Sequence, residues 1–315
     1  MLRYTLIRFA GMIGVLLAIS ILTFVIMHSI PGGPFDPMKM PVSATTQKNL
    51  DAKYGFDRPL YEQYLRYMWA ALHGDLGVPF QSPGETVVGL LARTWKVSAI
   101  IGGIALLLAY TVGMLLGFVS AVRQNSWLDH AATTIAVLGV VTPSFVVALL
   151  LILVLSLGLR LVPTGGWGDS WQQAIMPVLA FSFGLIAIVA RFTRNSVIEV
   201  LRSDFVRAAR AKGLSQGAVL RRHVLRNALT PVVTIAGPMF AGVITGSFFI
   251  ESIFRVPGIG QYFTTSAFQR DYPMIMALTL LYATLITLVY FITDLVYALI
   301  DPRVRVGGGE PTRLL

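Results

Sequence analysis

The sequence contains no cysteine among its 315 residues. A disulfide framework, a thiolate nucleophile and a thiolate-bound metal site are therefore excluded. Charged residues are also scarce: they make up 13% of the chain, against about 25% in an ordinary soluble domain, whereas hydrophobic residues make up 55%. Because a soluble fold of this size cannot easily bury so much apolar surface, the composition predicts a membrane protein.

Common patterns for ATP binding and for metal binding by histidine are missing as well. No Walker A sequence G-x-x-x-x-G-K-[ST] occurs, so the chain has no phosphate cradle for ATP of its own. The four histidines show no spacing of four residues and no H-E-x-x-H pattern, so we expect no metal site and no catalytic residue. The net charge of +10 raises nucleic-acid binding as a function, but in a membrane protein it more often marks cytoplasmic loops, and we expect no nucleic-acid partner.

Long apolar runs dominate the chain instead. About 20 apolar residues, at about 1.5 Å rise each, cross the roughly 30 Å of hydrocarbon in a bilayer. Six uncharged runs are of this order: Phe9 to Ile30, Val97 to Val122, Ala131 to Leu159, Ala174 to Ala190, Leu229 to Ile250 and Met274 to Thr293. We therefore predict an all-α integral membrane protein with six transmembrane helices, the third of which is kinked or divided by Pro143.

The distribution of Lys and Arg predicts the orientation of these spans. With the N-terminus inside, the inner segments hold fifteen basic residues against five acidic ones, whereas the outer segments hold ten against nine. This bias places both termini in the cytoplasm. The predicted organisation is an N-terminus with the first span at 1–30, an extracytoplasmic segment at 31–96, and a five-helix core at 97–315 with a cytoplasmic loop at 191–228.

The long outer segment contains a predicted helix of its own. Asp57-Arg58-Pro59 is typical of a helix start, and Gly74 of a helix end. Between them, one face carries apolar and aromatic residues, namely Leu60, Tyr64, Tyr67, Met68, Ala71 and Leu72. The aromatic content favours a helix that lies near the lipid headgroups, and a small folded cap packed on the bundle is the alternative.

The most informative stretch lies in the basic loop between the fourth and fifth runs. A short helix with one apolar face is predicted by four residues at helical spacing, namely Ile198, Leu201, Phe205 and Ala208. Gly213 ends this helix, and Ser215 caps a second one. Periodicity and charge alone leave two interpretations open: a connector held to anionic lipid by nine positive charges, or a docking site for another protein.

A resemblance favours the docking site. Residues 204–214, Asp-Phe-Val-Arg-Ala-Ala-Arg-Ala-Lys-Gly-Leu, resemble the EAA loop of ABC importer permeases, in the variant typical of the dipeptide/oligopeptide (Dpp/Opp) family. The small residues of that motif are matched by Ala208, Ala209 and Gly213. The general motif is not followed at three positions: Arg207 replaces a glutamate, His223 replaces an isoleucine, and the terminal proline appears late, as Pro231.

Further blocks along nearly the whole chain are similar to the same family and occur in the same order. They are Pro31-Gly-Gly-Pro-Phe35, Tyr54-Gly-Phe-Asp-Arg-Pro-Leu-Tyr-Glu-Gln-Tyr64, Gly74-Asp-Leu-Gly77, Thr142-Pro-Ser-Phe145, Ile250-Glu-Ser-Ile-Phe254, Val256-Pro-Gly-Ile-Gly260 and Asp301-Pro-Arg303. The long segment after the first span is similar to that of the B-type permease of this family.

The resemblance implies a type I ABC importer permease fold in a bacterial inner membrane. The chain would be a non-catalytic subunit that forms half of a translocation pathway for dipeptides or oligopeptides and works by alternating access. The implied partners are a sister C-type permease, two ABC ATPase subunits, an extracytoplasmic substrate-binding protein and membrane lipid. ATP and Mg would be bound by the ATPases, with no cofactor in this chain. The family also includes permeases for glutathione, nickel chelates and oligosaccharides, and these substrates stay open.

Two sets of residues are expected to carry this function. The resemblance assigns ATPase docking to Glu199, Arg202, Asp204, Phe205, Arg207, Ala208, Ala209, Gly213, Leu214 and His223. The candidates for the translocation path are Pro143, Ser144, Gly237, Pro238, Gly242, Ser247 and Glu251. For the glycines of the fifth run, close packing between helices is the alternative role.

Two carboxylates lie near membrane depth, where a charge is costly to bury and is a functional candidate by default. We expect Glu251 to face an outer vestibule or to pair with Arg255, and Asp294 to lie at the cytoplasmic end of the last run. A self-sufficient secondary transporter is the rival class of function. It needs intramembrane carboxylates or an ion path, of which the sequence offers almost none.

Overall fold

The computed structural model describes residues 2–30, 55–80, 82 and 84–300, which form helices and turns with no β-strand among them. These residues divide into two compact units. Unit 1 takes the described residues up to Trp95 and from Tyr262 onward, and unit 2 spans Lys96–Gln261. Helix α4 (Val87–Val122) begins in unit 1 and continues in unit 2.

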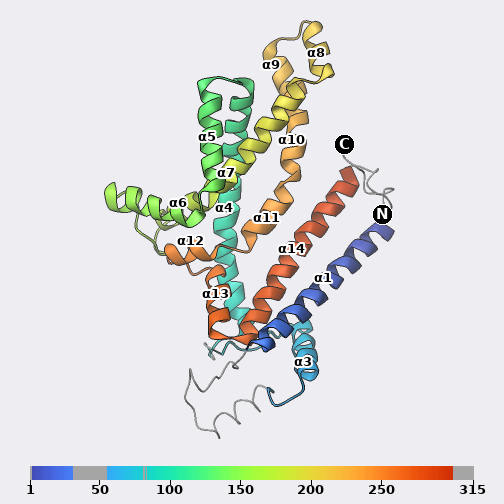
Figure 1. Cartoon of the computed structure of the whole chain (residues 1–315), viewed down its shortest axis with the longest axis vertical. Coiled ribbons are helices and arrows are strands. Elements are labelled where there is room, and N and C mark those ends of the chain that lie inside the picture. The colour runs from blue at the N-terminus through green and yellow to red at the C-terminus, as the bar shows by residue number, and fades with distance from the viewer. Residues whose placement is uncertain (1, 31–54, 81, 83, 301–315) are drawn as a thin grey trace. The chain divides into compact units, whose positions relative to one another are not determined.

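Unit 1 is built on two long helices that lie side by side, α1 (Leu2–Ser29) and α14 (Tyr272–Ile300), with α3 (Leu60–Leu72) near one end of α1 (Figure 1). Helix α13 (Gly260–Gln269) leads into α14. The core of this unit is rich in aromatic and sulfur-containing side chains, namely Phe24, Met27, Tyr272 and Met276. Asp294 forms an ion pair of 3.0 Å with Arg8, which links α14 to α1.

The helix predicted in the long outer segment is confirmed. Helix α3 begins after Pro59 and ends at Leu72, and Gly74 follows in the left-handed region at a φ of +82°. The side chain of Tyr64 reaches α1, where its hydroxyl lies 2.7 Å from Ser20 Oγ. Residues 31–54 of the predicted segment lie outside the described residues.

Unit 2 follows α4 with a series of helices of very different length. They are α5 (Trp127–Val141), α6 (Ser144–Leu151), the π-helix η1 (Ile152–Gly158), α7 (Gln172–Leu201), α8 (Asp204–Ala211), α9 (Gln216–Val219), the π-helix η2 (Leu220–Val224), α10 (Leu225–Thr234), α11 (Ala236–Ile244) and α12 (Phe248–Ile253). Its largest core cluster is built on Ile101, Met176, Ile250 and Phe254.

Close packing of α4 against α7 depends on two glycines. A Cβ atom on Gly117 would overlap the carbonyl oxygen of Ala190, and one on Gly113 would lie 2.9 Å from that of Ile186. The two glycines are four residues apart and therefore lie on one face of α4. Small residues at this spacing let the two helices approach closely.

Within the part of the chain that the structure describes, four helices are long and apolar enough to cross a membrane: Arg3–Ser29, Val87–Val122, Gln172–Leu201 and Tyr272–Val296. Two bent pairs of helices raise the number of candidate spans to six. The first pair joins Trp127–Val141 to Ser144–Gly158 at 108°, and the second joins Gln216–Thr234 to Ala236–Ile244 at 40°. The fold is therefore an all-helical membrane fold with four to six spans, in agreement with the prediction of six.

The third run departs from a single straight helix at the predicted proline. Pro143 cannot donate a backbone hydrogen bond and disfavours a helical conformation in the residue before it. Thr142 is accordingly extended, with φ of −75° and ψ of 121°. Pro143 therefore divides the run into α5 and α6, as predicted.

The fourth and fifth predicted runs differ from the observed helices in extent. Helix α7 does not end at Ala190 but continues to Leu201, so Arg191 and Arg194 belong to a helix instead of a loop. The run Leu229–Ile250 is not one helix, because it bends at Ile235 and breaks again before α12. At that second break Gly246 takes a φ of +77°, a conformation that a residue with a side chain adopts at a cost.

Candidate functional site

The predicted docking loop forms the tip of a helical hairpin in unit 2. Helices α7 and α10 run to and from this tip, and α8 and α9 form it (Figure 1). The prediction of a helix, a glycine turn and a second helix is confirmed. Its first helix is shorter than expected, because Ile198 and Leu201 belong to α7 and the chain breaks at Arg202 and Ser203.

Helix α8 has one face in the protein and one face outside it. Val206 and Ala209 are buried, and they pack in a cluster with Ala121 of α4 and Val197 of α7. The apolar face predicted from Phe205 and Ala208 is exposed instead. Phe205 leaves 46% of its surface uncovered. The helix is therefore held by its small buried face and presents a phenyl ring and an alanine outward.

The turn after α8 depends on backbone conformation. Gly213 has a φ of +79°, and no atom lies within 4 Å of the place where a Cβ would be. Glycine is favoured here because L-residues with a side chain adopt this conformation at a cost, not because space is short. Leu214 follows with 38% of its surface exposed, and Ser215 Oγ accepts a hydrogen bond from the amide of Ala218, which caps α9.

One pattern in this turn was missed in the sequence. Residues 213–217, Gly-Leu-Ser-Gln-Gly, fit the esterase pattern G-x-S-x-G. A nucleophile elbow requires a strand before the serine, and the segment before Ser215 is α8 and its turn. The hydroxyl of Ser215 caps a helix instead. The pattern therefore provides no hydrolase site.

The remaining residues of the predicted docking set surround α8. Glu199, Arg202 and Asp204 are exposed, and Asp204 pairs with exposed Arg207 one turn further along α8. His223 is half-buried in η2, and its carbonyl oxygen accepts a hydrogen bond of 2.7 Å from Asn227. The ten predicted residues thus lie between Glu199 at the end of α7 and His223 in η2, and all of them except His223 lie within residues 199–214.

A buried ion pair joins three helices of unit 2 and was not predicted. Asp129 of α5 is 1% exposed and accepts hydrogen bonds from Arg194 of α7, at 2.7 Å from Nε and 2.9 Å from Nη2. Ser120 Oγ of α4 donates to the same carboxylate at 2.5 Å, and the amide of Asn125 does so at 2.9 Å. No local spacing signals this pair, because its partners are 65 residues apart.

Three of the seven predicted path residues mark breaks between helices. Pro143 and Ser144 begin α6, and Ser247 caps α12 by accepting a hydrogen bond from the amide of Ile250. On α11, Pro238 and Gly242 are exposed and four residues apart, and Gly237 is half-buried. Among the described residues, no atom lies within 4 Å of the place where a Cβ on Gly242 would be, so no close helix contact forms there.

Glu251 has a different place from the one predicted. It is 2% exposed, and its carboxylate accepts hydrogen bonds from Ser98 Oγ at 2.7 Å, the Ser247 amide at 3.2 Å and the Gly260 amide at 2.7 Å. Ser98 Oγ in turn accepts a hydrogen bond of 2.8 Å from the Ile259 amide. The prediction that Glu251 faces a vestibule or pairs with Arg255 is therefore wrong.

Three glycines make room for this carboxylate. A Cβ atom on Gly246 would lie 2.5 Å from Oε1, one on Gly260 would lie 3.0 Å from Oε2, and one on Gly258 would overlap the carboxylate. Since backbone amides and a hydroxyl satisfy the buried charge, Glu251 fastens α12 and the turn before α13 to α4. Its role within this chain is structural.

Comparison with known proteins gives the family. Residues 113–306 match the family described as binding-protein-dependent transport system inner membrane component, and residues 1–91 match its N-terminal companion. The chain is 42% identical over 305 residues to the dipeptide transport system permease protein DppB of Bacillus subtilis, covering 97% of this chain and 98% of that protein. It is also 42% identical over 306 residues to the oligopeptide transport system permease protein OppB of Salmonella typhimurium, covering 97% and 100%.

The fold is similar to that of solved ABC transporters. An inward-facing structure of the MetNI methionine ABC transporter matches with a TM-score of 0.55 and 18% identity, over 67% of this chain and 96% of that chain. An amino acid ABC transporter crystallised with histidines matches with a TM-score of 0.53 and 15% identity, over 66% and 92%. Taken with the helical fold and the loop, these matches show that the chain belongs to the inner-membrane permeases of binding-protein-dependent ABC importers, in the B-type branch of the Dpp/Opp family.

Proposed function

We propose that this chain forms half of the pathway by which peptides enter the cell, together with a sister C-type permease. Two ABC ATPase subunits would bind ATP and Mg and drive the cycle, and an extracytoplasmic substrate-binding protein would deliver the peptide. The family is one of non-catalytic permease subunits, and the chain has no Walker A sequence. The peptide substrate is supported by the names of the dipeptide and oligopeptide permeases to which it is similar.

The observation that carries the docking proposal is the exposure pattern of α8. A basic amphipathic connector that only touched lipid would have no need of a second, separate face. Here Val206 and Ala209 bind the helix to its own protein, while Phe205 and Ala208 remain uncovered. Exposed aromatic and small side chains on a fixed helix suit a groove on a partner protein. We assign that groove to the ATPase.

The same proposal places the loop at 199–223 in the cytoplasm with both termini. The excess of basic residues in the predicted inner segments supports this orientation. Closure of the ATPases on ATP would push on α8, and α10 and α5 would transmit the movement to the pathway. The bidentate pair of Asp129 and Arg194 supports such a transfer, because it fastens α5 to α7 near the tip.

The exposed face of α11 is the part of unit 2 that we propose borders the pathway. Pro238 and Gly242 lie on this face, and no side chain of the described residues covers Gly242. The break at Pro143 and Ser144 and the cap at Ser247 would give the neighbouring helices their change of direction. Glu251 is left out of the proposed pathway because it is buried.

Charge placed on the outer face of α8 tests the docking proposal. Ala208→Glu puts a carboxylate at an exposed position, so the variant should insert and fold normally. We expect the rate of ATP-dependent peptide uptake to fall at least tenfold in this variant. The ATPases should also no longer co-purify with it, because an unpaired charge is costly to bury in an interface. Gln216→Glu adds the same charge at an exposed position of α9 outside the predicted set.

The control should keep both uptake and ATPase co-purification near wild type. Wild-type uptake and intact ATPase co-purification in Ala208→Glu would refute docking through this face. Equal losses of uptake and co-purification in both variants would show that a negative charge anywhere on the tip is harmful. That result would contradict the assignment of docking to α8.

A further inference from the structure

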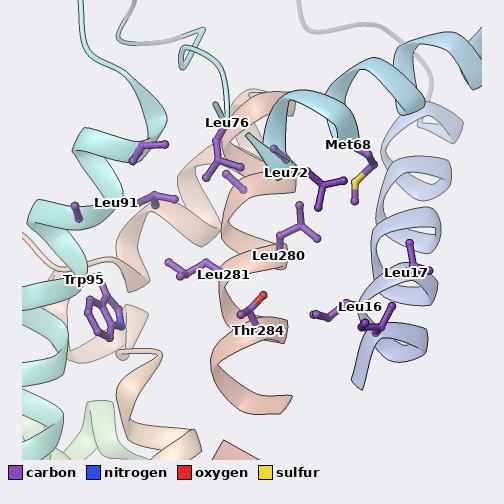
Figure 2. Close-up of a pocket in the computed structure, with 15 residues that line it drawn as sticks. Leu16, Leu17, Met68, Leu72, Leu76, Leu91, Trp95, Leu280, Leu281 and Thr284 are labelled. Carbon is purple, nitrogen blue, oxygen red and sulfur yellow. The ribbon is translucent and has the colours of Figure 1, made fainter. Parts of the chain in front are cut away.

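The helix that returns from the docking loop, Gln216–Thr234, does not keep the residue spacing of a regular α-helix. Residues on one side of an α-helix recur at intervals of three and four, because each turn takes about 3.6 residues. Helix α14 of unit 1 follows this rule: Leu280, Leu281 and Thr284 lie on the side that faces an apolar groove (Figure 2). A helix that buries one continuous stripe should show the same intervals.

The return helix buries such a stripe, with one interval that does not fit. Its buried residues are Val219, Val224, Ala228 and Val232, each at most 1% exposed. The last three are four positions apart, whereas Val219 and Val224 are five positions apart. In an unbroken α-helix these two valines would point about 140° away from each other. One of them would then leave the core cluster that both share with Ala121.

The π-helix η2 resolves this mismatch. Its single turn holds Leu220–Val224, and the amide of Leu225 donates a hydrogen bond to the carbonyl of Leu220, five positions back. A π-turn takes up more residues than an α-turn, so both valines stay on the buried side. At the end of the turn, the side-chain amide of Asn227 donates a hydrogen bond of 2.7 Å to the carbonyl of His223.

Burial of the two valines does not itself require a π-turn. A chain shorter by one residue in η2 would place Val219 and Val224 four positions apart, with the hydrogen bonds of an unbroken α-helix. Arg221 and Arg222 are exposed on the outer side of the turn and add nothing to the core. The π-turn is therefore a departure from regular structure that the packing does not need, and such departures are frequent at functional sites.

The position of η2 in the chain indicates what this departure does. The tip, formed by α8 and α9, precedes η2, and α10 follows it and leads to α11 after a bend of 40°. Helix α11 carries the exposed face that borders the proposed pathway. A π-turn is one of the few places where a helix bends sharply. A load on α8 therefore reaches α10 through a turn that can bend.

We propose that η2 is a hinge between the tip and α10. When the ATPases close, the return helix bends at η2 while Val224, Ala228 and Val232 stay packed, so the tip moves with the ATPases and is not pulled out of its own protein. The hinge depends on the docking of α8 proposed above, and it names the element that yields when the docked tip is moved.

Deletion of Arg222 tests the hinge in the complete transporter, because it removes the extra residue of the turn. All four buried residues are then four positions apart, so the variant should unfold at the same temperature as wild type or higher and should still co-purify with the ATPases. We expect its rate of ATP-dependent peptide uptake to fall about fivefold or more, because a conformational step is slowed. Arg222→Ala is the matched control: it removes the same side chain, keeps the π-turn and should transport like wild type.

Wild-type uptake in the folded deletion variant would overturn the proposal, because the π-turn would then only accommodate one additional residue. Equal loss of uptake in the deletion variant and in Arg222→Ala would overturn it as well, because the arginine side chain and not the turn would be responsible. Co-purification of the ATPases is measured on the same samples, so a failure of docking is seen separately, as its absence in the wild-type complex.

Hydrogen exchange in the unaltered complex gives a second test that needs no variant. The amides of residues 220–225 are compared in the resting complex and in a complex trapped with an ATP analogue that closes the ATPases. A hinge predicts that their exchange rates change about fivefold or more between the two states, while the amides of Ala228 and Val232 in α10 keep theirs. The same exchange rates at 220–225 in both states would overturn the proposal, whatever the deletion variant does.

Discussion

Asp129 and Glu251 are both carboxylates almost fully buried in unit 2, and each has its charge compensated in a different way. Asp129 receives two hydrogen bonds from the guanidinium group of Arg194, with further donors from Ser120 and Asn125. Glu251 accepts hydrogen bonds from backbone amides and from the hydroxyl of Ser98. Each of these two carboxylates therefore marks a joint between helices, and neither residue is free to bind a transported ion.

Removal of one partner of the Asp129 pair should be strongly destabilising. Arg194→Ala leaves a buried carboxylate without its counter-ion, and we expect a loss of about 3 kcal/mol in the free energy of unfolding in detergent, the lower end for such pairs because Arg194 is partly exposed. Arg191→Ala is the control, since Arg191 is exposed on the same helix and should change stability by at most about 0.5 kcal/mol.

The double variant Asp129→Ala/Arg194→Ala separates the pair from the effects of each side chain. Because it removes both charges, its loss should be smaller than the sum of the two single losses. Equal destabilisation by Arg191→Ala and Arg194→Ala, or additive losses in the double variant, would contradict the role given to this pair.

At the scale of elements, α8 and its glycine turn form the part of unit 2 that is both fixed and exposed. The helix has eight residues, fewer than an isolated helix needs to be stable in water, so it depends on the packing of Val206 and Ala209 and on the turn that follows. Gly213 provides this turn in the left-handed region, and the space around it is open.

Gly213→Ala should therefore weaken the tip through backbone strain and not through a clash. The left-handed conformation costs a residue with a side chain roughly 1–2 kcal/mol, which corresponds to roughly a 5- to 30-fold faster local opening. Hydrogen exchange of the amides in 204–214 measures this opening. In the control Gly217→Ala, the glycine lies inside α9 with no positive φ and no atom near its Cβ position, so exchange should be unchanged or slower. The same exchange rate in both variants would contradict this explanation of the glycine.

The sequence could predict the helix starts, breaks and caps that are determined by neighbouring residues. The start of α3 after Pro59, the division of the third run at Pro143 and the cap by Ser215 each follow from the chemistry of a residue and its neighbours. The limits of α7 were missed because charged residues such as Arg194 were counted as loop, although a buried partner on another helix allows an arginine inside a helix.

The face of α8 was misjudged for a related reason. Phe205 continues the helical spacing of Ile198 and Leu201, so sequence periodicity favours burying Phe205. The break at Arg202 and Ser203 interrupts that spacing, because it separates α8 from α7. The packing space beside Ala121 and Val197 accepts the smaller Val206 and Ala209. Glu251 could not be placed either, because the donors that satisfy it come from Ser98, which is 153 residues away, and from backbone amides, which no side-chain pattern reveals.

At the scale of the whole molecule, the chain has a helical membrane fold and family membership in the Dpp/Opp permeases. It has no Walker A sequence to bind ATP, and the two buried carboxylates described above are both engaged in structural contacts. These features support the proposal that ATPase subunits, and not this chain, supply the energy for transport. A secondary transporter, the rival class of function, would instead move peptide with an ion gradient and no ATPase.

Peptide uptake into proteoliposomes tests this dependence most directly. We compare vesicles that contain this chain alone with vesicles that contain it with the sister permease, both ATPases and the binding protein, each with ATP inside or without it and with or without a proton or sodium gradient. The account predicts accumulation of labelled di- to pentapeptides only in the complete, ATP-loaded vesicles, and no effect of either gradient. Accumulation of peptide by this chain alone, driven by an ion gradient, would contradict it.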